Sequence, residues 1–144
     1  MKLFTIGFTK KTAEQFFYRL KQPGLLRLVD ARLKNESQLA GFTKKNDLKF
    51  FLREICKIDY IHLPELAPSQ EILDAYKKNR GSWSVYEKQF TDLMIARRVE
   101  TMVDKGLISG GCLLCSEPTP EHCHRRLVAE HLQKKWGDVE IQHL

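Results

Sequence analysis

Reactive side chains crowd into one short stretch of the sequence, residues 113–127, which reads LLCSEPTPEHCHRRL. It holds two cysteines, two histidines, two glutamates and two arginines. Thiols and imidazoles bind soft metal ions, and they also serve as nucleophiles and proton carriers. Arginine beside them can hold a phosphate or a carboxylate. The stretch is therefore the first candidate for a functional site.

A structural zinc site is one interpretation, because Cys112 and Cys115 form a C-x2-C pair and His122, Cys123 and His124 follow. The pair falls within an expected strand, however, where side chains alternate between faces, so the two thiols should point to opposite sides. The three consecutive residues that follow should diverge by about 100° per step on a helix. We therefore predict no metal site and no cofactor, and the sequence leaves open whether a metal ion binds transiently at Cys115, Cys123 and a histidine.

A reactive thiol beside an anion site is the interpretation that we favour. Pro120 suits the first position of a helix, with Thr119 as its cap. Cys123 should then lie near a helix N-terminus, where free N–H groups and the helix dipole attract negative charge. A thiol in that place, flanked by imidazoles and Arg125, should ionise readily. Cys115, at the end of the preceding strand, should share this environment.

Glu117 and His124 would complete the chemistry of this stretch. Glu117 is expected to act as a general acid or base, or to orient a histidine, and His124 to carry protons. Cys115 is the first candidate for a nucleophile or ligand, and Cys123 is the second. A packing role competes for His124, because apolar residues follow it at helical spacing. Arg125 is expected to hold an anion bidentately.

Apolar runs and amphipathic runs alternate along the rest of the chain. Thr12 and Gln15 match a capping box at the start of the first helix. The alternation predicts an α/β protein, a single domain over residues 1–144, with a mostly parallel sheet of about five strands and helices on both faces. Strands are expected at 3–7, 25–31, 59–63, 111–116 and 139–144, and helices at 12–24, 46–56, 69–79, 82–106 and 120–137.

Polar side chains follow several of these strands at the point where each ends. In parallel sheets, ligands bind outside the carboxyl ends of the strands. Asp30 and Arg32 follow the second strand, and His62 ends the third. We therefore predict a rim at which Asp30, Arg32, His62 and Arg125 bind a substrate. The catalytic candidates at the same rim are Cys115, Glu117, Cys123 and His124.

Composition and charge indicate the kind of partner. The net charge of +6 and the pI near 9.2 fit an anionic small molecule or a nucleic acid, although a lysine-rich surface alone would give the same charge. No apolar run approaches the roughly 20 residues of a membrane span, and MKLFTIG is too short for an export signal. We expect a cytoplasmic protein with reduced cysteines, in which Cys56 and Cys112 are structural.

Longer motifs carry a resemblance to a known family. They are FTIGFTKKTAEQFFYRLKQPG, LVDAR, YIHLPEL, SWSVYEKQF and LLCSEPTPEHCHRRLVAEHL. With these, the chain resembles the bacterial and archaeal family called domain of unknown function 488, nearly from end to end. Phe8 departs from the family, which often has histidine there. The resemblance implies an α/β fold with a shared polar rim, and it implies no established reaction.

Three kinds of function stay open at this point. One is an enzyme that acts on an anionic substrate, and another is a nucleic-acid binding module whose loop lysines extend the rim. In a third, the rim residues mainly tie the strand ends together. A more distant similarity to rhodanese-like sulfurtransferases suggests thiol chemistry. Their loops surround a thiolate with backbone N–H groups, but the loop SEPTPEH here has two prolines and no glycine.

Overall fold

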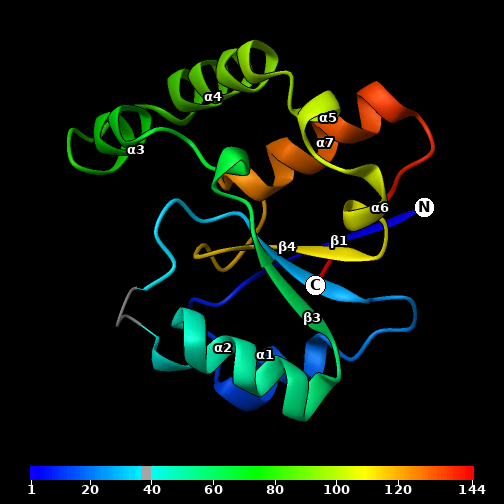
Figure 1. Cartoon of the computed structure of the whole chain (residues 1–144). Coiled ribbons are helices and arrows are strands. Elements are labelled where there is room, and N and C mark those ends of the chain that lie inside the picture. The colour runs from blue at the N-terminus through cyan, green and yellow to red at the C-terminus, as the bar shows by residue number, and fades with distance from the viewer. Residues whose placement is uncertain (37–39) are drawn as a thin grey trace.

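The computed structural model describes residues 1–36 and 40–144, and these form a five-stranded parallel sheet with helices on both faces (Figure 1). The strands lie in the order β3-β2-β4-β1-β5, and every neighbouring pair is parallel. This confirms the predicted α/β class. Their bounds are β1 (Lys2–Gly7), β2 (Arg27–Asp30), β3 (Asp59–His62), β4 (Gly111–Cys115) and β5 (Glu140–His143).

One face of the sheet is covered by α1 (Ala13–Arg19), α2 (Lys45–Phe51) and its π-helical extension η2 (Leu52–Cys56) (Figure 1). Thr12 caps α1 in the predicted capping box, in which its hydroxyl accepts from the Gln15 N–H and the Gln15 side chain accepts from the Thr12 N–H. Apolar side chains of these helices pack with those of β1, β2 and β4 into one core. The short turn η1 (Gly41–Thr43) precedes α2.

The other face carries the helices that build the candidate site. The central one is α7 (His124–Trp136), which packs on β1 and β4 (Figure 1). Beside it lie α4 (Trp83–Arg97) and α5 (Val99–Met102), and α3 (Gln70–Lys77) packs against α4. The remaining elements are η3 (Pro64–Leu66) and α6 (Lys105–Ile108). No helix formed by residues 1–36 and 40–144 is long and apolar enough to cross a membrane.

The predicted helix over residues 82–106 is wrong as one continuous element. It breaks after Arg97, because Arg98 adopts the left-handed conformation with φ 52° and ψ 52°. The change of direction places Val99 in the core and lets α5 pack on α7. Asp104 then accepts from the Gly106 N–H and starts α6. Contacts of the polypeptide with α7, rather than local periodicity, decide where the helix ends.

The predicted start of the last helix at Pro120 is also wrong. A turn closes where the Cys123 N–H donates to the Pro120 carbonyl at 3.3 Å, and Cys123 itself is extended with φ −137° and ψ 139°. The helix begins only at His124, so Cys123 occupies the N-cap position. An extended residue there turns back toward the sheet edge, and this geometry brings Cys123 to Cys115.

Candidate functional site

Arg125 is the buried centre of the carboxyl edge of the sheet. It comes from the first turn of α7, and its side chain is fully buried. Its Nη1 donates to the Cys115 Sγ at 2.9 Å and to the Glu117 carbonyl at 2.8 Å, and its Nε donates to the Thr5 hydroxyl at 3.3 Å. Its Nη2 has no partner among the described residues. Burial lowers the pKa of Arg125 to about 10, so the group stays charged at neutral pH.

Gly7 makes room for this arrangement at the end of β1. A Cβ atom at Gly7 would overlap the Glu117 carbonyl and would lie 2.8 Å from Arg125 Nη1. The loop after β4 therefore packs directly on the β1 backbone, and the Thr9 N–H donates to the Ser116 carbonyl at 3.0 Å. The sequence analysis missed this role, although a glycine that ends a strand is a signal of close backbone approach.

Cys115 and Cys123 are joined as a disulfide, and both are buried. The prediction that these two cysteines are reduced is therefore wrong for this structure. It missed the pairing because it placed Cys123 inside a helix, where the thiol would not have turned back to the strand. Cys112 lies fully buried in the opposite core, as predicted, and the Cys56 thiol donates to the Phe17 carbonyl. Burial raises the pKa of both free thiols.

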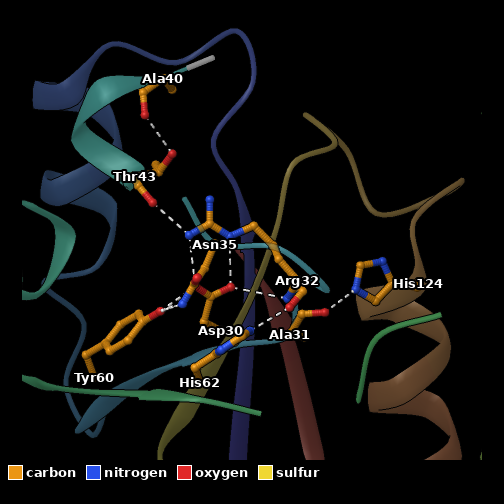
Figure 2. Close-up of polar contacts among 9 residues, drawn as sticks. All are labelled: Asp30, Ala31, Arg32, Asn35, Ala40, Thr43, Tyr60, His62 and His124. Atoms are coloured by element: carbon orange, nitrogen blue, oxygen red, sulfur yellow. Dashed lines mark hydrogen bonds and ion pairs between the residues drawn. The ribbon is translucent and has the colours of Figure 1, made fainter. Parts of the chain in front are cut away.

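His124 lies beside this cysteine pair and is itself buried. Its Nε2 is 2.8 Å from the Ala31 carbonyl (Figure 2). Because a carbonyl only accepts, Nε2 carries the proton and Nδ1 keeps its lone pair. Burial lowers the pKa of His124 to about 4, which makes the imidazole neutral at pH 7. One ring nitrogen and the sulfurs of Cys115 and Cys123 lie within 4.8 Å of one another.

Asp30 holds Arg32 in a fixed position at the ends of β2 and β3 (Figure 2). The Asp30 carboxylate accepts from Arg32 Nε and Nη2 at 2.8 Å each, and from the Tyr60 hydroxyl at 2.6 Å. Burial and this carboxylate raise the pKa of Tyr60. Arg32 Nη2 also donates to the Thr43 carbonyl, and His62 Nε2 donates to the Arg32 carbonyl at 2.7 Å. Arg32 Nη1 is buried without a partner among the described residues.

A pocket of about 340 Å³ opens beside these groups. Of the predicted site residues, Arg32, Glu117, Cys123 and His124 line it. The other four predicted residues are not among the described residues that line the pocket; they are Asp30, His62, Cys115 and Arg125. They contact the lining residues from behind, through the bonds given above. All eight predicted site residues thus lie at one edge of the sheet. Four of them line the pocket, and the other four contact these lining residues from behind.

Several lining residues were not predicted as part of the site. Tyr76 and Lys77 come from α3, Tyr86 from α4, and Phe8 follows β1. The helical spacing of Tyr86 indicates a core residue, and Tyr86 does pack in the core while it also lines the pocket. Lys77 forms an ion pair with Glu117, which ties α3 to the loop after β4. No local sequence signal announces a contact between these distant segments.

The fold and this edge define an α/β protein with a cysteine, histidine and arginine cluster at the carboxyl ends of its parallel strands. The family model described as Domain of unknown function DUF488 matches residues 12–132, and the chain belongs to this family. This confirms the resemblance seen in the motifs. Neither the search of curated proteins nor the search of solved structures gives a match.

Proposed function

We propose that this protein binds a phosphorylated substrate in the pocket and acts on it through the groups of the cysteine, histidine and arginine cluster. The observation that carries the proposal is the Nη1 of Arg32, which has no hydrogen-bond partner among residues 1–36 and 40–144. Arg32 lines the pocket, and only 6% of its surface is exposed. A buried N–H without a partner costs about 1–3 kcal/mol, and more on a charged group. An oxygen of a bound anion would satisfy it.

The lining of the pocket supports a ligand with an anionic part and an apolar part. Lys34 adds positive charge and Lys77 is paired with Glu117, while Phe8, Tyr76 and Tyr86 add aromatic surface. Apolar and aromatic walls with a few polar groups are typical of small-molecule sites. A phosphate attached to a planar group would match both features. We therefore favour a small phosphorylated molecule over inorganic phosphate alone.

The proposed roles follow from the positions of the side chains. Arg32 contacts the anion, and Asp30 and His62 position Arg32. Cys123 and His124 face the ligand. Glu117 lines the same pocket and is the candidate proton carrier.

Cys115 and Arg125 form the support behind the lining. In the reduced protein, the guanidinium would stabilise a Cys115 thiolate through the 2.9 Å contact. Cys115 thus keeps its place as the first candidate nucleophile or ligand, and Cys123 is the second.

Calorimetric titration of the full chain tests the proposal. Inorganic phosphate, a nucleoside monophosphate and the matching nucleoside would be titrated under reducing conditions and in the presence of EDTA. We expect the monophosphate to bind most tightly and the nucleoside to bind least. Lys34→Ala should weaken binding several-fold, whereas Lys78→Ala, which removes a lysine paired with Asp74 at the surface, should not. An absence of binding by every phosphorylated probe would refute the proposal.

Rhodanese-like thiol chemistry has less support. That chemistry relies on backbone N–H groups directed at the thiolate. In the loop after β4, the Glu117 carbonyl instead accepts from Arg125, and the Pro118 carbonyl accepts from Lys11. The loop therefore supplies acceptors where a thiolate cradle needs donors.

Nucleic-acid binding is the second candidate. The Lys11 Nζ donates to the Pro118 carbonyl at 3.3 Å, so the basic loop after β1 lies against the cysteine loop. With the net charge of +6, this arrangement favours phosphate contacts beyond the pocket. Filter binding of single-stranded and double-stranded oligonucleotides at two salt concentrations tests it. Affinity should fall steeply with salt, and an absence of binding at low salt removes this candidate.

A further inference from the structure

Cys115, Cys123 and His124 have the composition and the spacing of a three-ligand metal site. We propose that the reduced protein binds one Zn²⁺ through the sulfurs of Cys115 and Cys123 and through Nδ1 of His124, with a fourth position open to the pocket. One ring nitrogen of His124 and the two sulfurs lie within 4.8 Å of one another. Tetrahedral zinc, with bonds of about 2.0–2.3 Å, holds its ligand atoms roughly 3.5 Å apart, so small side-chain movements suffice.

The reasons for which the sequence predicted no metal do not apply to this set. Only Cys115 of the C-x2-C pair belongs to it, so the opposite direction of Cys112 has no bearing. Cys123 is extended and His124 is the first helical residue, so the two side chains are not separated by a regular helical step. The third ligand comes from across the loop, which no local spacing rule detects.

The hydrogen bond of His124 prepares its ring for a metal. Nε2 donates to the Ala31 carbonyl at 2.8 Å, which fixes the tautomer that leaves Nδ1 unprotonated. Metal-binding histidines almost always donate their other nitrogen to a carbonyl or a carboxylate in this way. The backbone at the end of β2 therefore orients the imidazole beside the two sulfurs.

Arg125 supports the sulfur ligands from behind. Its Nη1 lies 2.9 Å from the Cys115 Sγ, and its charge offsets the charge of a thiolate. Hydrogen bonds of this kind around the ligands tune metal affinity. The two thiols lose their protons to solvent when the ion binds.

The backbone separation of the two cysteines also suits a shared ion. Their Cα atoms are 7.4 Å apart, which exceeds the range of about 4.4–6.8 Å usual for cysteines that bond directly. Two thiolates that share a zinc ion stand farther apart than two bonded sulfurs. Two thiolates and one imidazole are also a donor set that zinc favours.

The open position gives the site the form of a catalytic rather than a structural metal centre. Three protein ligands with a fourth place for water or substrate are typical of catalytic zinc. Cys123 and His124 line the pocket, and Arg32 lines it as well. An ion held there could therefore meet an oxygen of the same anion that Arg32 is proposed to contact. Metal binding itself does not depend on that contact, so it can be tested without any anion.

Titration of the reduced, metal-free full chain with Co²⁺ alone tests this inference. Cobalt bound by thiolates gives a sulfur-to-metal charge-transfer band, and we expect the band to saturate at one equivalent and to disappear when Zn²⁺ is added. Cys115→Ser, Cys123→Ser and His124→Ala should each weaken binding by at least about tenfold. The matched controls are Cys56→Ser and His122→Ala, which should bind as the wild type does.

An absence of the band in the wild type would overturn the inference, and so would equal binding by His124→Ala and His122→Ala. X-ray absorption at the zinc edge of the wild type covers the case in which a variant fails to fold. A shell with two sulfur atoms and one imidazole supports the site, and any other protein ligand set overturns it. The anion titrations in EDTA fail or succeed independently of these results.

Discussion

Two arginines are buried at the same edge of the sheet, and their charges are handled differently. Arg32 forms a two-point ion pair with the buried carboxylate of Asp30. Arg125 is buried more completely, yet among the described residues its hydrogen-bond acceptors are a sulfur, a carbonyl and a hydroxyl. Each retains one buried nitrogen that has no partner in the part of the chain that the structure describes. Arg32 is thus bonded directly to a carboxylate, whereas among the described residues Arg125 is not, and Glu117 and Glu121 act on its charge only from a distance.

The difference suggests what each arginine is for. A buried charge is expensive unless it is paired. Asp30 fixes Arg32, and under the proposed function the Nη1 of Arg32 would contact the anion. For Arg125 the nearest group that can become negative is Cys115, and it can do so only when the disulfide is reduced. The reduced protein would therefore complete a second buried ion pair that the oxidised protein lacks.

Removing Asp30 should have the largest effect, because it would leave Arg32 without its directly bonded carboxylate. We expect Asp30→Ala to lower the free energy of unfolding by about 3–5 kcal/mol, as for other buried pairs that lose one partner. Denaturant unfolding followed by circular dichroism measures this. Asp74→Ala, which removes an exposed pair with Lys78 and an exposed hydrogen bond from Gln70, should change stability by less than about 1 kcal/mol. Similar values for the two variants would contradict the comparison.

His124 lies at the same edge as the two arginines, and its protonation would add a third positive charge near Arg125. The folded protein holds the pKa of His124 at about 4 through burial, whereas an unfolded chain has the ordinary value near 6.5. The unfolded state therefore binds this proton first, and stability should fall as the pH drops from about 6.5 to about 4. The loss attributable to this residue is at most about 3 kcal/mol.

Unfolding curves recorded between pH 7 and pH 4 check this expectation. In His124→Gln the drop over that interval should be smaller by most of the same amount. His122→Ala should keep the full drop, since no comparable burial applies to its exposed ring. If His124→Gln has the same pH profile as the wild type, other groups cause the acid sensitivity. One such group is His143, because burial lowers its pKa as well.

Gly7 tests how closely the surroundings of Arg125 are packed. Gly7→Ala would push the Glu117 carbonyl and the Arg125 guanidinium away from β1, so we expect a loss of about 1–3 kcal/mol in unfolding free energy. Gly41→Ala is the matched control, because open space surrounds its Cβ position. If neither substitution changes the free energy of unfolding, the loop after β4 does not pack against β1 as closely as it does in the structure.

Much of the sheet could be predicted because short apolar runs bounded by turns identify strands wherever they occur. The rule that ligands bind at the carboxyl ends of parallel strands predicts Asp30, Arg32, His62 and Cys115 at one edge of the sheet. The geometry of the cysteine loop could not be predicted in the same way. The extended backbone of Cys123 follows a local turn at Pro120 and accompanies the contact of Arg125 with the Glu117 carbonyl, and the helix pattern of the sequence indicates neither.

The aromatic wall of the pocket was missed for a related reason. Tyr86 has the helical spacing of a core residue, so its sequence pattern does not distinguish it from a residue that only packs. In the structure it is indeed 4% exposed. Its place in the pocket depends on how α3 and α4 sit over the end of the sheet. The break at Arg98, which ends α4, also follows from packing on α7. Hydrophobic periodicity indicates which face of a helix is buried, but it does not indicate which elements that face contacts.

The last prediction asks whether Arg125 compensates a thiolate. Arg125→Met keeps much of the side-chain volume and removes the charge and the donors. If the guanidinium stabilises ionised Cys115, the substitution should lower stability more in the reduced protein than in the oxidised protein. A hydrogen bond to a charged group contributes about 1.5–3 kcal/mol, so a difference of about 1–2 kcal/mol is expected. Unfolding at neutral pH with and without a reductant measures it.

Arg32→Met supplies the comparison that makes this measurement decisive. Its partner is the permanent carboxylate of Asp30, so its effect on stability should be large but nearly equal in the two redox states. Equal effects for Arg125→Met would mean that its charge is compensated in neither state. A redox dependence confined to Arg125 would instead tie this arginine to the thiol chemistry of the site. The same reduced state is the one in which Cys115 and Cys123 become free to bind a metal ion.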